Sequence, residues 1–237
     1  MTRHGERLCL DFLTDSDANI HILSPYLHIM GCNLRDLATP ENIDLATLSG
    51  KRVGIDAFLT AFQFLTTMRD RSPQGDGGPL RAENGKVVSH LMGFLNRTTT
   101  LLKLGIRPVY IFDGTAPELK ADEIASRRAR REEAERVHKE ALAAGDFALA
   151  QKMAPRIMHY SQEMVDETKH MLDLLGVPWV VAEAEGEGQA AVMARIGQLD
   201  AVATQDWDAL LYGTPVLIRN MMTAGHKPVS YTHLTLP

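Results

Sequence analysis

The stretch Val-Ala-Glu-Ala-Glu-Gly-Glu-Gly at residues 181–188 places acidic side chains directly after a short apolar run. A second stretch, Gln-Asp-Trp-Asp at 205–208, repeats this arrangement about twenty residues later. The acids that the two stretches contribute are Glu185, Glu187, Asp206 and Asp208. Short apolar runs that end at glycine and polar residues are typical of buried strands. We therefore predict that carboxylates follow the strands of this fold.

Two earlier aspartates occupy the same kind of position. Asp56 closes the apolar run Arg-Val-Gly-Ile-Asp, and Asp113 follows Val-Tyr-Ile-Phe and precedes a glycine. In an open parallel sheet the carboxyl ends of the strands share one edge, and ligands bind at that edge. The sequence thus predicts six carboxylates at one edge of a sheet.

Strand and helix patterns alternate along the chain, which predicts an α/β fold with a parallel sheet and crossover helices. The expected strands are 52–56, 108–112, 177–181, 201–204 and 215–218. The expected helices are 57–68, 87–104, 118–142, 147–153, 156–175, 188–196 and 207–211. The helix at 118–142 is strongly charged and has almost no apolar face, so it either lies in solvent or spans between other elements.

The bulk composition fits a single large domain, or a domain with an insertion. The chain has 237 residues, of which 45% are hydrophobic, and a net charge of −5. No apolar run approaches the eighteen or so residues of a membrane span, and two cysteines make no disulfide framework. We therefore expect an intracellular protein that does not bind membranes.

The two ends of the chain do not follow the core pattern. Residues 1–29 show no sustained period and are interpreted as an additional leader outside the domain. Residues 226–237 likewise show no core period and are interpreted as a non-native tail, so the domain is expected to cover 30–225.

Each acid has a structural alternative to a metal-binding role. Asp56, Asp206 and Asp208 are suited to capping helices, and Glu185 and Glu187 are favoured by the dipole at a helix start. Six acids that converge, however, repel one another by ~4 kcal/mol per pair at about 4 Å and an effective dielectric near 20. A cation relieves that repulsion, and oxygen-only ligands favour Mg²⁺ or Mn²⁺. We predict two such ions, an arrangement used for phosphodiester cleavage.

The charged helix also carries a group of cations, Lys120, Arg127, Arg130 and Arg131. Lys120 and Arg127 are seven residues apart and so lie on one helical face. The alternative is a solvated helix with Glu–Arg pairs, because three glutamates follow at 132, 133 and 135. Beside a metal site, we interpret the cations as a clamp for phosphate.

Several motifs in collinear order resemble the flap endonuclease family of structure-specific 5′ nucleases. They are Gly-Lys-Arg-Val-Gly-Ile-Asp-Ala (50–57), Ser-His-Leu-Met-Gly-Phe (89–94), Pro-Val-Tyr-Ile-Phe-Asp-Gly (108–114), Pro-Glu-Leu-Lys (117–120), Arg-Arg-Ala-Arg-Arg (127–131), Ala-Glu-Gly-Glu-Gly-Gln-Ala (184–190) and Thr-Gln-Asp-Trp-Asp-Ala-Leu-Leu-Tyr-Gly (204–213). The resemblance covers the N-terminal and intermediate regions, and Gln-Asp-Trp-Asp is closer to archaeal members.

The resemblance implies a PIN-like nuclease fold with a helical arch over about 115–160, through which a single-stranded 5′ flap passes. It implies that the six acids bind Mg²⁺ and that Lys120 and Arg127 steady the scissile phosphate. The DNA contacts it implies involve Gly31, Phe62, Arg69, Arg97, Arg130, Arg131 and Glu185. Phe62 stands where the family has a stacking tyrosine, although it also fits the core stripe of its helix.

The implied partner is branched DNA with a 5′ flap, and the implied protein is a monomer. The family's remaining metal-binding aspartate, its duplex-binding helices and its sliding-clamp peptide are expected beyond the end of this sequence. Glu183 adds a negative charge where the family is neutral. Two alternatives stay open: a 5′ exonuclease or bubble-cutting relative, and a non-catalytic DNA-binding fragment.

Overall fold

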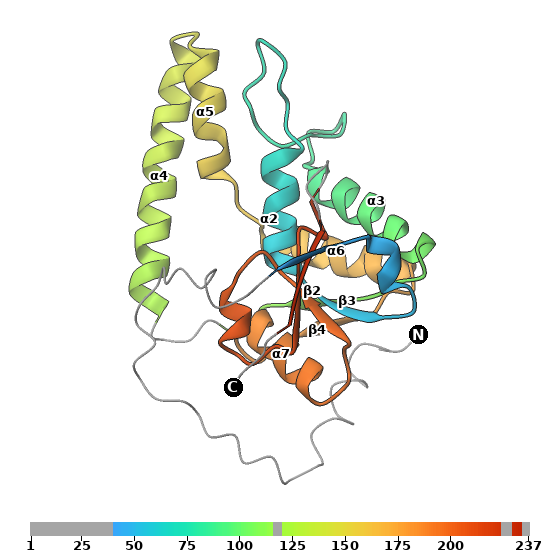
Figure 1. The fold of residues 1–237 in the computed structure, drawn as a ribbon. Coiled ribbons are helices and arrows are strands. Elements are labelled where there is room, and N and C mark those ends of the chain that lie inside the picture. Colours follow the sequence, from blue (N-terminus) through green and yellow to red (C-terminus); the bar gives the residue numbers. More distant parts are fainter. Residues whose placement is uncertain (1–39, 116–119, 224–228, 234–237) are drawn as a thin grey trace, which may run out of the picture.

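The computed structural model describes residues 40–115, 120–223 and 229–233. The expected leader at 1–29, and Gly31 with it, lie outside the described residues. Figure 1 shows a central sheet with helices on both of its faces and a long helical hairpin that stands away from it.

The sheet has seven strands in the order β1-β7-β6-β5-β2-β3-β4. Their bounds are Glu41–Ile43 (β1), Arg52–Asp56 (β2), Arg107–Phe112 (β3), Trp179–Val181 (β4), Ala201–Ala203 (β5), Val216–Arg219 (β6) and Val229–His233 (β7). The five strands from β6 to β4 are parallel, as the alternating pattern predicts. The α/β class is therefore confirmed.

Two strands were not predicted. β7 pairs antiparallel with β6, and β1 pairs antiparallel with β7, so both lie at one end of the sheet. The sequence analysis placed residues 226–237 outside the domain, whereas β7 at Val229–His233 is a strand of the sheet. β1 has three residues, and such a short pairing leaves no period of its own in the sequence.

The helices follow the sequence pattern closely. They are Ala57–Thr67 (α2), Ser89–Lys103 (α3), Ala121–Ala143 (α4), Phe147–Ile157 (α5), Gln162–Leu174 (α6) and Gly186–Arg195 (α7), with 3₁₀ turns at Leu45–Leu48 (η2) and Asp208–Leu210 (η4). The second helical pair divides later than expected, since α5 runs through Pro155. Ser161 then caps α6 by accepting a hydrogen bond from the Met164 N–H.

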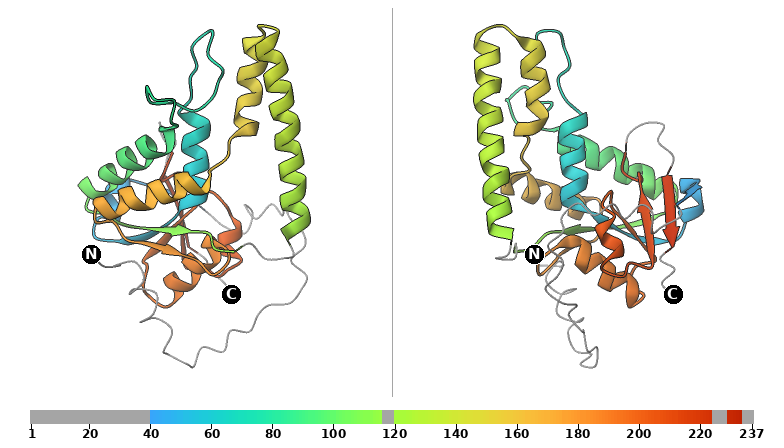
Figure 2. Two further views of the ribbon diagram at one scale, coloured as in Figure 1. Left: turned by 180° about the vertical axis from the view of Figure 1, so that it is seen from behind. Right: turned by 60° about the vertical axis from the view of Figure 1, so that its left-hand side comes forward.

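The alternation of side chains along the strands builds two cores. Tyr110 and Phe112 of β3 pack into the larger core with α2, α3 and α6, whereas Ile111 faces the smaller core beneath α7. This three-layer order is visible from two further directions in Figure 2. The buried Tyr110 hydroxyl is 2.7 Å from Thr98 Oγ1 of α3, so its polar group is satisfied.

The apolar stripe of α2 faces the larger core as expected, except at Phe62. Ala61, Phe64 and Leu65 are buried, but Phe62 is 44% exposed. The interpretation of Phe62 as a core residue is therefore wrong, since its side chain lies on the solvent side of α2.

α4 and α5 form the hairpin that projects from the body (Figure 1). α4 buries only Ala134, His138 and Ala141. Ion pairs one turn apart line its outer surface, among them Arg128–Glu132 at 2.9 Å and Lys139–Glu135 at 2.8 Å. Exposed pairs of this kind contribute little to stability, because solvent screens them. The expected arch thus corresponds to a hairpin of two helices.

Among the described residues, no helix has the length and apolar character that crossing a membrane would require.

The contact between α2 and α3 makes a direct stability prediction. Gly93 lies where a Cβ atom would come within 2.2 Å of the Phe64 ring. Gly93→Ala forces the two helices apart and should lower the free energy of unfolding by about 1–3 kcal/mol. Denaturant unfolding measures this change. Ser126→Ala on the exposed side of α4 is the control and should leave stability within about 0.5 kcal/mol of wild type; a Gly93→Ala chain as stable as that control would contradict the packing.

Candidate functional site

The carboxyl ends of β5, β2, β3 and β4 lie side by side, and the predicted acids follow them. Asp56 is the last residue of β2 and caps α2 by accepting the Leu59 N–H at 2.9 Å. Asp113 directly follows β3, and Glu185 is the N-cap residue of α7 after β4. Glu187 lies in the first turn of α7. The structure therefore places these acids along one edge, as the parallel order requires.

Asp206 and Asp208 follow β5 at the same edge. The Asp208 N–H donates to Asp206 Oδ1 at 3.0 Å, and the Asp206 N–H donates to Thr204 Oγ1 at 3.2 Å. Both side chains are exposed. The pair folds the turn after β5 and presents its carboxylates towards solvent.

A buried threonine links two acids from distant parts of the chain. Thr204 Oγ1 lies 3.5 Å from Asp56 Oδ2 and 3.4 Å from Glu187 Oε1. Thr204 was not predicted as a site residue, although it ends the apolar run that precedes Asp206. A polar residue at the last position of a buried strand was the available signal.

A second group forms around Asp113 and Glu185. Asp113 Oδ1 accepts the Gly186 N–H at 2.7 Å. Glu185 is held on both oxygens: Lys120 Nζ lies 2.6 Å from Oε1, and the Tyr212 hydroxyl donates to Oε2 at 2.6 Å. Tyr212 was also missed, because it belongs to an apolar stretch in which a core role was the simplest reading.

The electrostatics of the edge show uncompensated negative charge. Burial, together with the nearby Asp113 charge, raises the pKa of Asp56 to about 7. Burial and the charges of Asp56, Asp206, Asp208 and Glu185 raise the pKa of Glu187 to about 8. Burial and neighbouring carboxylates also raise the pKa of Asp113 and of Asp208. Asp56, Asp113, Glu187 and Asp208 are therefore close enough to other carboxylates for their ionisation to be disfavoured.

Glu185 and Lys120 behave as an ion pair within this negative region. Burial opposes ionisation of Glu185, but Lys120 and the Tyr212 hydroxyl hold its pKa below the usual value. Burial likewise opposes the charge of Lys120, but Glu185, Glu123 and Glu187 together raise its pKa. Lys120 is thus the cation that the acids attract most directly.

The carboxylates do not form a preassembled cage. In the part of the chain that the structure describes, no three Asp, Glu, His or Cys side chains converge closely enough to hold a metal ion. The expectation of a single tight cluster is corrected to two groups, one around Thr204 and one around Gly186. The physical reason is that backbone N–H groups, Lys120 and Tyr212 occupy the oxygens that would otherwise meet.

The remaining cations of the arch have local partners. Arg127 is ion-paired with Glu123, one turn earlier on α4. Arg130 is exposed and Arg131 is half-buried on the same helix. Lys120 and Arg127 therefore share the start of α4, although only Lys120 contacts the acids.

Two predicted DNA-contacting arginines are hydrogen-bonded to the backbone. Arg97 of α3 donates from Nε to the Met221 carbonyl at 2.7 Å. Arg69, which follows α2, donates to the carbonyls of Gly77 and Gln151. Phe62, by contrast, is 44% exposed on α2.

Comparisons with known proteins agree with this arrangement. The XPG N-terminal domain matches residues 30–134, and the XPG I-region matches residues 176–236. Flap endonuclease 1 of Aeropyrum pernix is 45% identical over 201 residues, and that of Pyrococcus horikoshii is 44% identical over 198 residues. Each match covers 84% of this chain, and the chain spans 56% and 57% of the two relatives.

Solved structures give the same result. Flap endonuclease-1 from Methanococcus jannaschii is similar with a TM-score of 0.64 and 39% identity, over 86% of this chain and 63% of that chain. The catalytic core of Rad2 in complex with a DNA substrate has a TM-score of 0.58 and 28% identity, over 84% of this chain and 51% of that chain.

The raised pKa values predict an unusual pH dependence of stability in the metal-free chain. Asp56 and Glu187 hold protons in the folded state up to about pH 7 and about pH 8, whereas in the unfolded chain they release them near pH 4. The folded state therefore binds more protons between pH 4 and 8, and stability falls as the pH rises through this window.

Glu187→Gln removes one of these ionisations and should stabilise the chain at pH 8 by on the order of 2 kcal/mol, with a flatter pH profile. Thermal melting in EDTA from pH 4 to 9 measures the effect. Glu83→Gln in an exposed loop is the matched control and should follow the wild-type profile. A wild-type melting temperature that rises from pH 5 to 8 would contradict the proposed repulsion.

Proposed function

Because this chain belongs to the flap endonuclease family, whose N-terminal domain and I-region it carries, we propose that it is a structure-specific 5′ flap endonuclease. It hydrolyses DNA phosphodiesters at a junction between a single-stranded 5′ flap and duplex DNA. The chain covers about half of its curated relatives, so the proposal concerns the part of the reaction that this domain carries.

One observation carries the proposal. Six acids follow four strand ends at a single edge of the sheet, and Lys120 at the start of α4 lies 2.6 Å from one of them, Glu185. Such an accumulation of carboxylates lowers stability unless cations or protons relieve the repulsion. A cationic residue beside it offers a place for a phosphate group.

We assign the metal role to Asp56, Asp113, Glu185, Glu187, Asp206 and Asp208, with two Mg²⁺ ions that Mn²⁺ can replace. The fit rests on donor chemistry, because the edge offers carboxylates and the Thr204 hydroxyl, which hard cations prefer. Ligation requires Asp113 and Glu185 to exchange their present partners, Gly186 N–H, Lys120 and Tyr212. Bound ions would supply Lewis-acid stabilisation of the phosphodiester and lower the pKa of water.

The residues of the chain itself bind and orient the substrate. Lys120 exchanges Glu185 for the scissile phosphate and stabilises the charge that develops on it. Arg127 exchanges its exposed Glu123 partner for the same phosphate region. Thr204 and Tyr212 keep Asp56, Glu187 and Glu185 oriented while this exchange takes place.

The DNA duplex and flap would contact residues around this edge. Phe62, exposed on α2, offers a surface for base stacking. Arg130 and Arg131 on α4 attract the phosphate backbone, and Arg97 and Glu185 add further proposed contacts. Gly31, which lies outside the described residues, completes the proposed set. We further propose an intracellular monomer; sliding-clamp binding would belong to a full-length relative.

The first test is cleavage of a labelled double-flap substrate with Mg²⁺, beside gel-shift binding in Ca²⁺. The wild-type chain should cut near the junction, and Asp113→Ala should abolish cutting while DNA still binds. Glu83→Gln, in an exposed loop, should cut at the wild-type rate. Wild-type binding without any cut product would instead support a non-catalytic DNA-binding fragment, and unchanged turnover by Asp113→Ala would remove that residue from the site.

A second test separates chemistry from binding at the arch. Lys120→Ala should lower kcat about 10²- to 10³-fold with KM nearly unchanged, because the lost interaction strengthens in the transition state. Single-turnover kinetics measure both quantities. Lys139→Ala at the far end of α4, where the lysine pairs with Glu135, is the control and should behave as wild type. A raised KM at constant kcat would make Lys120 a binding residue only.

A further inference from the structure

The loop between α2 and α3 rises beside the helical hairpin and contacts its outer half. In Figure 1 this loop extends beyond the end of α2, at the height of α5. Residues 70–78 form its ascending part and are folded by their own hydrogen bonds. The Ser72 N–H donates to Asp70 Oδ1 at 2.9 Å, and the Gly78 N–H donates to Asp76 Oδ1 at 2.7 Å. These aspartate turns give the loop a defined shape.

Both helices of the hairpin bond to the backbone of this loop. On α4, His138 Nε2 lies 2.8 Å from the Asp76 carbonyl oxygen, and the histidine is only 7% exposed. On α5, Gln151 Nε2 donates to the carbonyls of Ser72 at 2.8 Å and Gly75 at 3.2 Å. The loop is therefore joined to each helix by a side chain that reaches its main chain.

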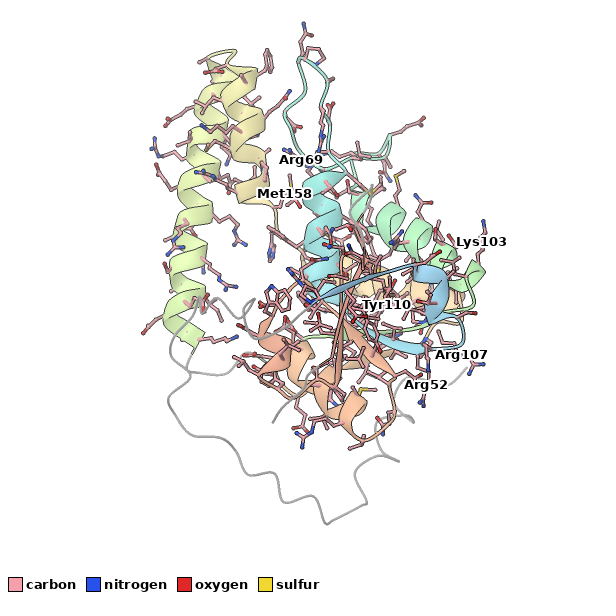
Figure 3. All side chains as sticks on the ribbon, in the orientation of Figure 1. Arg52, Arg69, Lys103, Arg107, Tyr110 and Met158 are labelled. Atoms are coloured by element: carbon pink, nitrogen blue, oxygen red, sulfur yellow. The ribbon has the colours of Figure 1, made fainter. Side chains whose placement is uncertain are left out.

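Arg69 closes the connection from the body side. Its Nη1 donates to the Gly77 carbonyl at 3.3 Å and to the Gln151 carbonyl at 3.2 Å. Figure 3 shows Arg69 at the far end of α2, on the side of α5. One guanidinium thus binds the loop and α5 together.

The Gln151 carbonyl on α5 can accept from Arg69 because it has no hydrogen-bond partner within its own helix. In a regular helix the Gln151 carbonyl would accept the N–H of residue 155, but that residue is Pro155 and has no N–H. The unpaired carbonyl accepts from Arg69 instead. A proline near the end of α5 therefore creates the point at which the hairpin is held.

The backbone of the loop lies directly against α5. At Gly77 a Cβ atom would stand 2.7 Å from Gln151 Cα and 3.1 Å from Ala154 Cβ, and its φ is +71°. Gly75, Gly77 and Gly78 are all buried. Only glycine permits both this approach and this backbone conformation.

We propose that residues 70–78 form a latch that fixes the outer half of the α4–α5 arch to the body, with Arg69, His138 and Gln151 as its positioning residues. α4 buries few of its own side chains, so the latch decides where its N-terminal end, with Lys120 and Arg127, stands relative to the acids. Arg69 acts on DNA through the arch, because its guanidinium is committed to two backbone carbonyls. The consequence for cleavage rests on the proposed function; the latch itself does not.

Hydrogen–deuterium exchange of the DNA-free chain tests the latch. Arg69→Ala and Gln151→Ala should speed amide exchange in 134–143 and 147–157 about tenfold, with exchange in α3 unchanged. His138→Ala is a third variant. If His138→Ala does not fold, the result for Gln151→Ala decides the test. The controls are Arg71→Ala and Lys152→Ala, exposed neighbours that make no loop–arch bond in the described structure, and they should exchange as wild type. Wild-type exchange in both Arg69→Ala and Gln151→Ala would overturn the latch.

DNA affinity in Ca²⁺ separates a latch from a phosphate contact. Gln151→Ala carries no charge change, yet it should weaken flap binding about as much as Arg69→Ala, and the double variant should lose little more. The slope of affinity against salt should stay as in wild type, whereas a lost phosphate contact lowers it by about one unit. Weaker binding in Arg69→Ala alone, with a reduced slope, would overturn the role assigned to Arg69. The cleavage assay of the wild-type chain is independent of these measurements.

Discussion

Repulsion between carboxylates at the carboxyl ends of β5, β2, β3 and β4 is the constraint on which the rest of this structure depends. Parallel strands end at one edge, so a chain that puts an acid after each strand must concentrate negative charge there. Asp56 and Glu187 show the strength of the effect, since burial and like charge raise their pKa values to about 7 and about 8. The folded state therefore disfavours the charged forms of Asp56 and Glu187. A function that uses their charge explains why they are present.

The chain limits this repulsion by giving the acids separate partners. Thr204 stands between Asp56 and Glu187, and the Gly186 N–H holds Asp113. Lys120 and Tyr212 together neutralise and orient Glu185. None of these partners is itself an acid, and each can be exchanged for a cation or a phosphate oxygen. The same contacts that reduce this repulsion therefore also hold the carboxylates at the edge where we propose that metal ions bind.

The sequence predicted the parts of this arrangement that depend on local pattern. Asp56 and Asp113 follow apolar runs, and the topology alone then brings them to one edge. Thr204 and Tyr212 could not be found this way, because their roles depend on which side chains meet in space. β7 was missed because its antiparallel pairing with β6 and β1 connects segments without a crossover pattern. The resemblance to the family assigned Arg69 to DNA, but it could not predict the bonds of its guanidinium to the Gly77 and Gln151 carbonyls, the second of which Pro155 leaves without a helical partner.

The orientation of α4 relative to the body is not fixed by the residues of α4 alone. α4 carries ion pairs along most of its length and buries three small or polar side chains, so its packing contributes little to fixing it in place. A helix of this kind can remain helical and still change its angle to the body. Its orientation must then come from groups outside it, namely the contacts with α5 and the backbone of residues 70–78. Because Lys120 lies at the opposite end of α4 from His138, a small rotation at the latch becomes a large displacement of the cation above the acids. The position of Lys120 relative to the acids therefore depends on the loop at residues 70–78 as much as on the residues of the site.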